Sequence, residues 1–235
     1  MIQIQKTNLE ELVQNHFDKL KSKLEDNFPN NCKYTLETIL KAKPEKLDEI
    51  AKWFVTLDKD VQTKYEYINI SGYGNFSNKK KSYNAYDLAK SLNISACPYC
   101  NRNYTFTVIK GKNEILRPDI DHFYDKDTYP ILALSFYNLV PSCIECNRTL
   151  KRTKDFNINT HLHPYLDDFN SKAKFNYKYI STDNIEIELK TKDSKTQNNI
   201  KDLKLNEIYN EGYIDIVQDL IEKAEIYNES YIDEL

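Results

Sequence analysis

Residues 97–154 read CPYCNRNYTFTVIKGKNEILRPDIDHFYDKDTYPILALSFYNLVPSCIECNRTLKRTK. The stretch opens with one pair of cysteines, Cys97 and Cys100, and a second pair, Cys143 and Cys146, lies near its end. Two residues separate the cysteines of each pair, so that one tight turn can present both sulfurs to a tetrahedral zinc ion. We therefore predict a zinc site. Because four cysteines close the coordination sphere, this zinc is expected to be structural rather than catalytic.

The length and composition of the whole chain limit the class of protein to which this stretch can belong. Its 235 residues and formal net charge of −3 indicate one domain or two closely packed parts, and they argue against a strongly basic or disordered protein. No apolar run is long enough to cross a bilayer, and a polar segment follows Met1, so we predict a cytoplasmic protein without a membrane partner. Four of the five cysteines fall in the two pairs, which fits a reducing compartment better than a disulfide scaffold.

Charge is distributed unevenly along the chain. Residues 155–235 contain 9 lysines against 17 acidic residues, whereas all arginines of the protein lie in residues 97–154. The planar guanidinium group suits phosphate, so cations beside the cysteine pairs are candidates for substrate binding. The predicted substrate-binding residues are Arg102, Arg148, Lys151 and Arg152. For Arg102, an ion pair with a nearby acidic residue is the alternative.

Apolar residues recur at helical spacing on both sides of the central stretch. Helices are predicted at residues 7–27, in two or three segments within residues 34–70, and at residues 83–93. Thr7 and Glu10 have the spacing of a capping box, and His16 is expected to be a packed core histidine. Residues 71–82, with two glycines and three consecutive lysines, are predicted to form a loop.

Within the central stretch the pattern predicts two strands followed by a helix. The expected elements are a strand at Tyr104–Ile109, a turn at Lys110–Asn113, a strand at Ile115–Phe123, a buried connection at 129–140 and a helix from Cys143 to Lys151. Further along, residues 174–190 alternate as a second hairpin around Asp183 and Asn184. Residues 199–230 have helical spacing, with Gly212 as the expected kink.

These patterns predict an α+β fold. A mainly helical protein is expected around a central zinc-stabilised ββα core, with an additional β-hairpin and a C-terminal helix. The predicted domains are a helical region at 1–96, the core at 97–170, and the hairpin with the acidic helix at 171–235, packed on the core. The acidic helix is not expected to face nucleic acid.

The chemistry is expected at Asp121, His122 and Asn147. Carboxylate and amide oxygens are hard ligands that suit Mg²⁺ or Mn²⁺, and a neutral imidazole is a natural acceptor for a proton from water. Asp119 lies two residues before Asp121, on the same face of a strand, and is the alternative ligand. Asp121 is preferred because it adjoins His122.

The order of these residues resembles the HNH endonuclease family, which has the ββα-metal fold. The matching positions run from Cys97 to Lys151, about a quarter of the chain, and include both cysteine pairs, Asp121-His122 and CN at 146–147. The resemblance implies that His122 activates water, that Asp121 and Asn147 hold a catalytic Mg²⁺ or Mn²⁺, and that Asn138 holds the loop between strand and helix. It also implies that the four cysteines bind zinc and that the chain hydrolyses DNA phosphodiester bonds.

The sequence of the whole stretch is similar to that of HNH proteins from bacterial phage-defence operons, in particular those of the Septu type. That resemblance implies an ATPase partner encoded in the same operon. Two alternatives remain open: a zinc-stabilised module that binds nucleic acid or protein without catalysis, and a nuclease subunit that is active only with its ATPase partner. His161 and His163 follow the motif. They could reach the metal or phosphate, or simply stabilise a turn.

Overall fold

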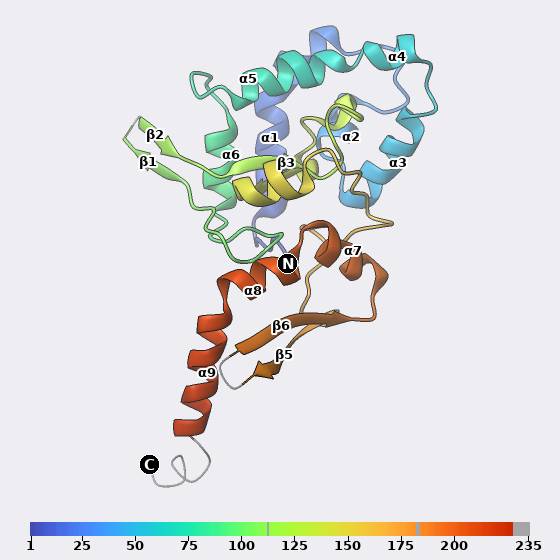
Figure 1. Cartoon of the computed structure of the whole chain (residues 1–235). Coiled ribbons are helices and arrows are strands. Elements are labelled where there is room, and N and C mark those ends of the chain that lie inside the picture. The colour runs from blue at the N-terminus through green and yellow to red at the C-terminus, as the bar shows by residue number, and fades with distance from the viewer. Residues whose placement is uncertain (112, 182–183, 228–235) are drawn as a thin grey trace. The chain divides into compact units, whose positions relative to one another are not determined.

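The computed structural model describes residues 1–111, 113–181 and 184–227 (Figure 1). The chain divides into two compact units, Met1–Asp168 and Phe169–Leu235, which we call the N-unit and the C-unit. The predicted helical region at 1–96 lies in the N-unit, and so does the predicted core except for its last two residues. The boundary falls two residues before the predicted one at 170/171. Both units combine helices with small antiparallel sheets.

The N-unit contains helices α1 (Leu9–Leu24), α2 (Leu36–Leu40), α3 (Pro44–Phe54), α4 (Lys59–Thr63), α5 (Gly74–Ser77) and α6 (Ala85–Leu92), and strands β1 (Val108–Lys110), β2 (Asn113–Leu116), β3 (Asp119–His122) and β4 (Leu139–Ser142). Short 3₁₀ helices lie at Glu25–Asn27, Pro130–Leu132 and Phe136–Asn138. Two π-helical segments lie at Ile68–Tyr73 and Glu145–Lys151, and we call the second one the site helix. The C-unit contains β5 (Ala173–Ser181), β6 (Asn184–Thr191), α7 (Ser194–Asp202), α8 (Leu205–Gly212) and α9 (Ile214–Ile226).

The helix predicted at 7–27 is confirmed as α1 and the short 3₁₀ turn after it, but its predicted capping box is wrong. The helix follows Asn8, which has φ −104° and ψ 26° and makes no side-chain cap hydrogen bond. That backbone is not the extended conformation from which a side chain caps the first turn. The prediction for His16 is confirmed, because its Nδ1 lies 2.9 Å from the Tyr83 hydroxyl and its Nε2 lies 2.8 Å from the Leu134 carbonyl oxygen.

The predicted loop at 71–82 is wrong over its first half, where Ile68–Tyr73 and α5 are helical. Gly72 does not break the helix. A Cβ built there would meet Leu134 Cδ1 at 3.0 Å and Leu24 Cδ2 at 3.1 Å. The glycine therefore permits close approach between this helical segment, α1 and the buried loop that contains Leu134.

The strand pairing of the central stretch differs from the prediction. β1 and β2 form a short hairpin, but the expected strand at Ile115–Phe123 is broken, and β3 pairs instead with β4. Pro118 lies at the break, where a residue without an N–H cannot continue a ladder. Asp119 pairs with Ser142 and His122 with Leu139. The predicted turn at Lys110–Asn113 includes residue 112, which lies outside the described residues.

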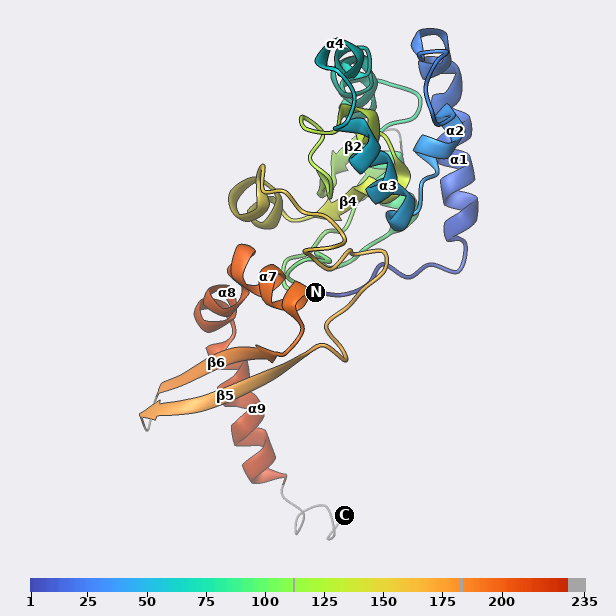
Figure 2. The ribbon, with the colours of Figure 1, turned by 90° about the vertical axis from the view of Figure 1, so that its right-hand side faces the viewer.

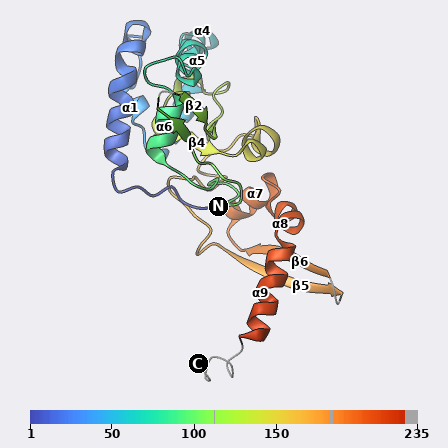
Figure 3. The ribbon, with the colours of Figure 1, turned by 90° about the vertical axis from the view of Figure 1, so that its left-hand side faces the viewer.

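In the C-unit the hairpin predicted at 174–190 is confirmed as β5 and β6, with Phe175 opposite Leu189 (Figures 2 and 3). Asp183 of its predicted turn lies outside the described residues. The Asn206 side chain on α8 accepts a hydrogen bond from the Leu189 N–H at 2.9 Å, and Asn210 accepts one from Ile187 at 2.7 Å. These side chains therefore satisfy backbone groups along one edge of the hairpin.

The single helix predicted at 199–230 is wrong, because the chain forms α7, α8 and α9 there. Lys204 separates the first two with a left-handed backbone, φ 51° and ψ 42°, and Gly212 ends the second. Residues 228–230 of the prediction lie outside the described residues. Among the helices that the structure describes, none combines the length and apolarity needed to cross a membrane.

Candidate active site

The two cysteine pairs converge as their spacing predicts. Their four Sγ atoms lie within 4.8 Å of one another, and all four residues are buried. Tetrahedral zinc with Zn–S bonds of about 2.3 Å requires S···S distances of about 3.8 Å. Cys100 Sγ and Cys143 Sγ are 3.9 Å apart. The donor set and the spacing therefore fit a structural zinc ion, which would be held by Cys97, Cys100, Cys143 and Cys146.

Local backbone geometry shapes this four-cysteine cluster. After the first pair, Asn101 adopts φ 50°, and its N–H donates to the Cys97 carbonyl at 2.7 Å, which closes a tight turn. In the second pair the Cys146 N–H donates to Cys143 Sγ at 3.4 Å. Burial raises the pKa of the Cys97 thiol, while hydrogen bonds from the other three sulfurs lower the pKa of Cys100. A thiolate formed in the cluster is thus stabilised by its neighbours, which favours metal binding.

The second cysteine pair also places the site helix. Cys143 follows β4 directly, and Cys146 lies in the first turn of the site helix. The helix lies against β3 through Asn147, Arg148 and Lys151, which are spaced to share one helix face. Zinc would therefore fix the end of the site helix from which Asn147 reaches β3.

Asp119 is held by two residues of the site helix. Arg148 donates to both of its oxygens, from Nε at 2.6 Å and from a terminal nitrogen at 2.7 Å, and Asn147 Nδ2 donates at 3.2 Å. The Arg148 side chain is 67% exposed, so the strength of this ion pair is reduced by solvent. Arg148, predicted to bind substrate, is therefore at the surface with its guanidinium occupied by a carboxylate.

Asp121 lies in a buried network. Tyr99 Oη donates to its Oδ2 at 2.6 Å, and Lys151 Nζ donates to its Oδ1 at 3.2 Å. Lys151 Nζ also donates to the His122 carbonyl at 2.6 Å, and the Lys151 side chain is 1% exposed. The predicted role of Lys151 in contacting a DNA backbone does not agree with this burial. Instead, its ammonium group balances the Asp121 charge inside the protein.

His122 is oriented by the loop between β3 and β4. Its Nε2 lies 2.9 Å from the Ala133 carbonyl oxygen, and the Tyr73 ring packs edge-on at 4.4 Å between centroids. A carbonyl can only accept, so Nε2 donates, and in the neutral ring Nδ1 carries the lone pair. Burial lowers the pKa of His122 to about 4, and the Asp121 charge raises it by a smaller amount. Nδ1 has no hydrogen-bond partner within the described part of the chain.

Asn138 fixes the same loop from within. Its Oδ1 accepts from the Tyr124 N–H at 2.7 Å, and its Nδ2 donates to the carbonyls of Tyr124 and Leu132, both at 3.0 Å. The residue is fully buried. Asn138 therefore has a structural position, one that shapes the loop carrying the Ala133 carbonyl.

The remaining predicted residues lie elsewhere in the N-unit. Arg102 is exposed and donates to Asn103 Oδ1 at 3.0 Å. Arg152 is exposed at the end of the site helix, where it has φ 51°. His161 stacks on Phe156 at 3.7 Å between ring centroids. His163 packs against Phe123, and burial lowers its pKa to about 3.

Two tyrosines were missed by the sequence analysis. Tyr99 binds Asp121, and Tyr73 covers one side of His122 and donates to the Ile120 carbonyl at 3.3 Å. Tyr99 could have been noticed, because it lies between the first two cysteines. Tyr73 gives no such signal, because 46 positions separate it from Asp119, where β3 begins.

The fold and site together define a mixed α and β protein with a four-cysteine site that fits zinc. Among curated proteins, the chain is similar to Septu protein PtuB of Bacillus thuringiensis, with 33% identity over 117 residues, which cover 46% of this chain and 41% of PtuB. The chain thus matches less than half the length of that relative. No protein-family model matches the chain. No solved structure matches it.

Proposed function

We propose that the chain is a metal-dependent endonuclease of the HNH type that hydrolyses DNA phosphodiester bonds. The observation that carries the proposal is the hydrogen bonding and protonation of His122. Its Nε2 donates to the Ala133 carbonyl, which leaves the Nδ1 lone pair available to accept a proton. Because burial lowers its pKa to about 4, the ring is neutral at physiological pH, as a general base must be.

Asp121 and Asn147 are the residues that we propose to hold a divalent ion, with Asp119 as the alternative carboxylate. Asp119 and Asp121 share a face of β3 by strand periodicity, and Asn147 contacts Asp119 from the site helix. Oxygen donors of this kind suit Mg²⁺ or Mn²⁺. Such an ion supplies charge stabilisation for the phosphate and the leaving oxygen when it is bound.

In the proposed reaction His122 Nδ1 takes a proton from water as the water oxygen attacks phosphorus. The bond from phosphorus to the 3′ oxygen breaks, and that oxygen takes up a proton, which leaves 5′-phosphate and 3′-hydroxyl ends. Asn138 supports the step indirectly, because it holds the loop whose Ala133 carbonyl fixes the imidazole. Arg102 and Arg152 are exposed and are proposed to contact the DNA backbone.

We further propose a role in anti-phage defence beside an ATPase partner, in the bacterial cytoplasm. The similarity to Septu protein PtuB supports this proposal over the matched 117 residues. Under this view the chain belongs to a system in which the partner controls when cleavage occurs.

The test is plasmid cleavage by the purified chain with added Mg²⁺ or Mn²⁺. His122→Ala is expected to lower the cleavage rate by roughly 10²–10⁴-fold, the usual contribution of a general base. His161→Gln is the matched control, because His161 is a buried histidine stacked on Phe156, and this variant is expected to retain cleavage. Zinc content and thermal unfolding are measured for each variant, so that loss of folding is recognised. Cleavage unaffected by His122→Ala would refute the assignment of the base.

A second candidate is a zinc-stabilised binding module without catalysis. This candidate is favoured because both carboxylate oxygens of Asp121 already accept hydrogen bonds, one from Tyr99 and one from Lys151. The same assay separates the two: a binding module shifts DNA or a protein partner on a gel but cuts nothing with any metal. If the chain cuts only after the operon's ATPase is added, it is the nuclease subunit of a complex.

A further inference from the structure

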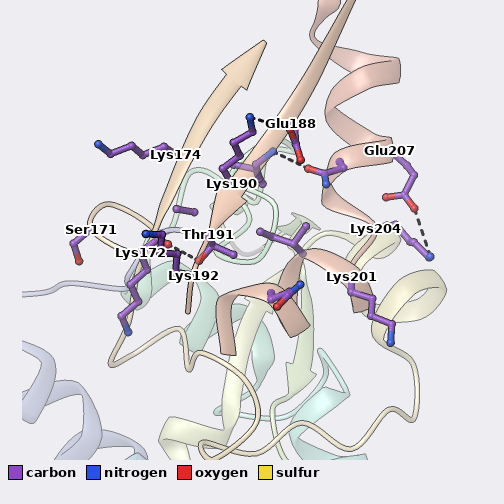
Figure 4. Close-up of a pocket in the computed structure, with 15 residues that line it drawn as sticks. Ser171, Lys172, Lys174, Glu188, Lys190, Thr191, Lys192, Lys201, Lys204 and Glu207 are labelled. Carbon is purple, nitrogen blue, oxygen red and sulfur yellow. Dashed lines mark hydrogen bonds and ion pairs between the residues drawn. The ribbon is translucent and has the colours of Figure 1, made fainter. Parts of the chain in front are cut away.

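The C-unit contains a cavity of about 920 Å³ that is lined by lysines (Figure 4). It lies between the start of β5, the end of β6 and the junction of α7 with α8. Lys172 and Lys174 lie on one side, and Lys201 and Lys204 lie on the other (Figure 4). Lys190 and Lys192 complete the set. We call this feature the lysine pocket.

The pocket is rich in positive charge, whereas the C-unit as a whole carries a net negative charge. Residues 169–235 contain 9 lysines, no arginine and 14 acidic residues. Of these, six lysines line the pocket, against two acidic residues, Glu188 and Glu207, among those that the structure describes. Residues 214–226 instead carry four acidic residues and one lysine. The unit is therefore electrically polarised, and its cations gather at one concave surface.

Three of the six pocket lysines have no ion-pair partner in the part of the chain that the structure describes. Glu188 lies 3.5 Å from Lys190, and Glu207 lies 3.4 Å from Lys204. For Lys174, Lys192 and Lys201, the described residues provide no ion-pair partner. Gathering like charges without partners raises the electrostatic energy of the folded state, and a bound anion would lower it.

The walls of the pocket are fixed by hydrogen bonds. Thr191 Oγ1 donates to the Lys172 carbonyl at 2.6 Å, which joins the two strands at the pocket. Asn206 accepts from the Leu189 N–H at 2.9 Å, which attaches α8 to β6. Lys204 occupies a left-handed backbone position with φ 51°, where glycine or asparagine is the usual choice. A lysine therefore occupies this corner at a conformational cost.

We propose that the lysine pocket binds the phosphodiester backbone of a nucleic acid, independently of base sequence. Lysine is a point charge that contacts phosphate without requiring a fixed orientation, and backbone contacts of this kind carry no sequence information. Arginine, which recognises guanine through two parallel hydrogen bonds, is absent from this unit. The inference deepens the proposed nuclease function, because it gives the chain a substrate-holding surface apart from His122.

The lining differs from a typical small-molecule site in its side chains, although the lysine stems make much of its surface apolar. Sites for such ligands are mostly apolar and aromatic, with few polar groups. Here the apolar side chains of the lining are Ala173, Leu189 and Ile200, and no aromatic residue is among the described lining residues. Charged ends of long, flexible side chains surround the cavity, as suits a polyanion that is held by several weak contacts.

The test measures DNA binding separately from cleavage. The full chain carrying His122→Ala, without added Mg²⁺ or Mn²⁺, is titrated into a fluorescently labelled 30-nucleotide DNA, as single strand and as duplex, over a series of NaCl concentrations. The pocket variant is Lys174→Gln/Lys192→Gln/Lys201→Gln. The control, Lys178→Gln/Lys195→Gln/Lys223→Gln, removes the same charge from the same unit outside the pocket lining. Lys204→Asn removes one further pocket charge while suiting the left-handed backbone.

The pocket variant is expected to bind at least tenfold more weakly and to reduce the slope of log K against log salt by about 3, one unit for each phosphate contact. The control is expected to stay within about twofold at moderate salt, where distant exposed charges are screened. Equal losses in both variants would overturn the proposal, because net charge alone would then explain binding. Competition by inorganic phosphate or a mononucleotide at concentrations matching the DNA phosphates would also overturn it in favour of a small phosphorylated ligand. The plasmid assay with the otherwise unmodified chain reports separately on His122, so either proposal can fail alone.

Discussion

The burial of Lys151 leads to a prediction that separates a structural role from a substrate-binding role. The perturbation is Lys151→Met. In the native protein the Lys151 Nζ atom lies 5.2 Å from the centroid of the Phe156 ring, and methionine keeps a long side chain next to that ring. It removes both the ion pair with Asp121 and the hydrogen bond to the His122 carbonyl. Asp121 is 3% exposed, so its charge would remain in the protein interior with Tyr99 as its other partner.

The expected cost follows from this geometry. Breaking a buried ion pair by removal of one partner typically costs about 3–5 kcal/mol, because the other charge is left uncompensated. We therefore expect Lys151→Met to lower the free energy of unfolding by about 3–5 kcal/mol. Asp121→Asn/Lys151→Met removes both charges and is expected to be more stable than the single Lys151→Met variant by roughly 2 kcal/mol, within the range of coupling found between contacting residues.

The assay is urea unfolding, followed by circular dichroism, with zinc held constant. Lys154→Met is the matched control, because Lys154 is an exposed lysine three residues further along the chain. Its expected effect is within about 0.5 kcal/mol, as for most surface substitutions. A Lys151→Met protein that is as stable as this control, but has lost DNA binding, would refute the structural reasoning and restore the predicted contact with substrate.

Three further predictions concern the rest of the N-unit. One zinc per chain is expected by elemental analysis, and Cys143→Ser or a strong chelator should lower the unfolding temperature, since a zinc ion bound by these cysteines would hold the site helix. Gly72→Ala should destabilise by about 1–3 kcal/mol from overpacking against Leu134, whereas Gly74→Ala, whose Cβ meets nothing within 4 Å, should be neutral or stabilising by thermal unfolding. Burial lowers the pKa of His16 to about 4, so unfolded protein binds the proton first as pH falls below about 6.5. His16 alone should therefore remove about 2 kcal/mol of stability between about pH 7 and pH 5, in addition to the losses expected from the buried His122 and His163. His16→Gln should lose that part of the pH dependence, and an unchanged pH profile would contradict the assignment.

The four-cysteine cluster was predictable because its information is local. Two residues between cysteines allow a tight turn, and four soft ligands suit zinc, so convergence of the four cysteines could be predicted from spacing alone. The amphipathic α1 and the β5–β6 hairpin were predictable for a similar reason, since a periodic apolar face needs no knowledge of its partner. The local sequence was also enough to predict that Asp119, Asp121 and His122 lie on an extended strand.

What could not be predicted depends on partners that are distant in sequence. Pro118 marks the break before β3, but nothing local reveals that β3 pairs with β4. Gly72 has the same local signature as a loop glycine, and only the positions of Leu24 and Leu134 show that it serves close packing. Lys151 looks like a surface cation, because a charged side chain is usually exposed and its buried partner is 30 positions away.

The four-cysteine cluster and the Asp121–Lys151 pair act on opposite ends of the same short helix. The site helix has seven residues, which is too short to be stable alone, so its position must come from contacts at its ends. Cys143 and Cys146 fix its start, and Lys151 fixes its last residue to β3. Asn147 lies between these two anchors and contacts Asp119 at 3.2 Å. Loss of either anchor should therefore loosen Asn147 against β3, and this links the stability predictions above to the proposed metal site.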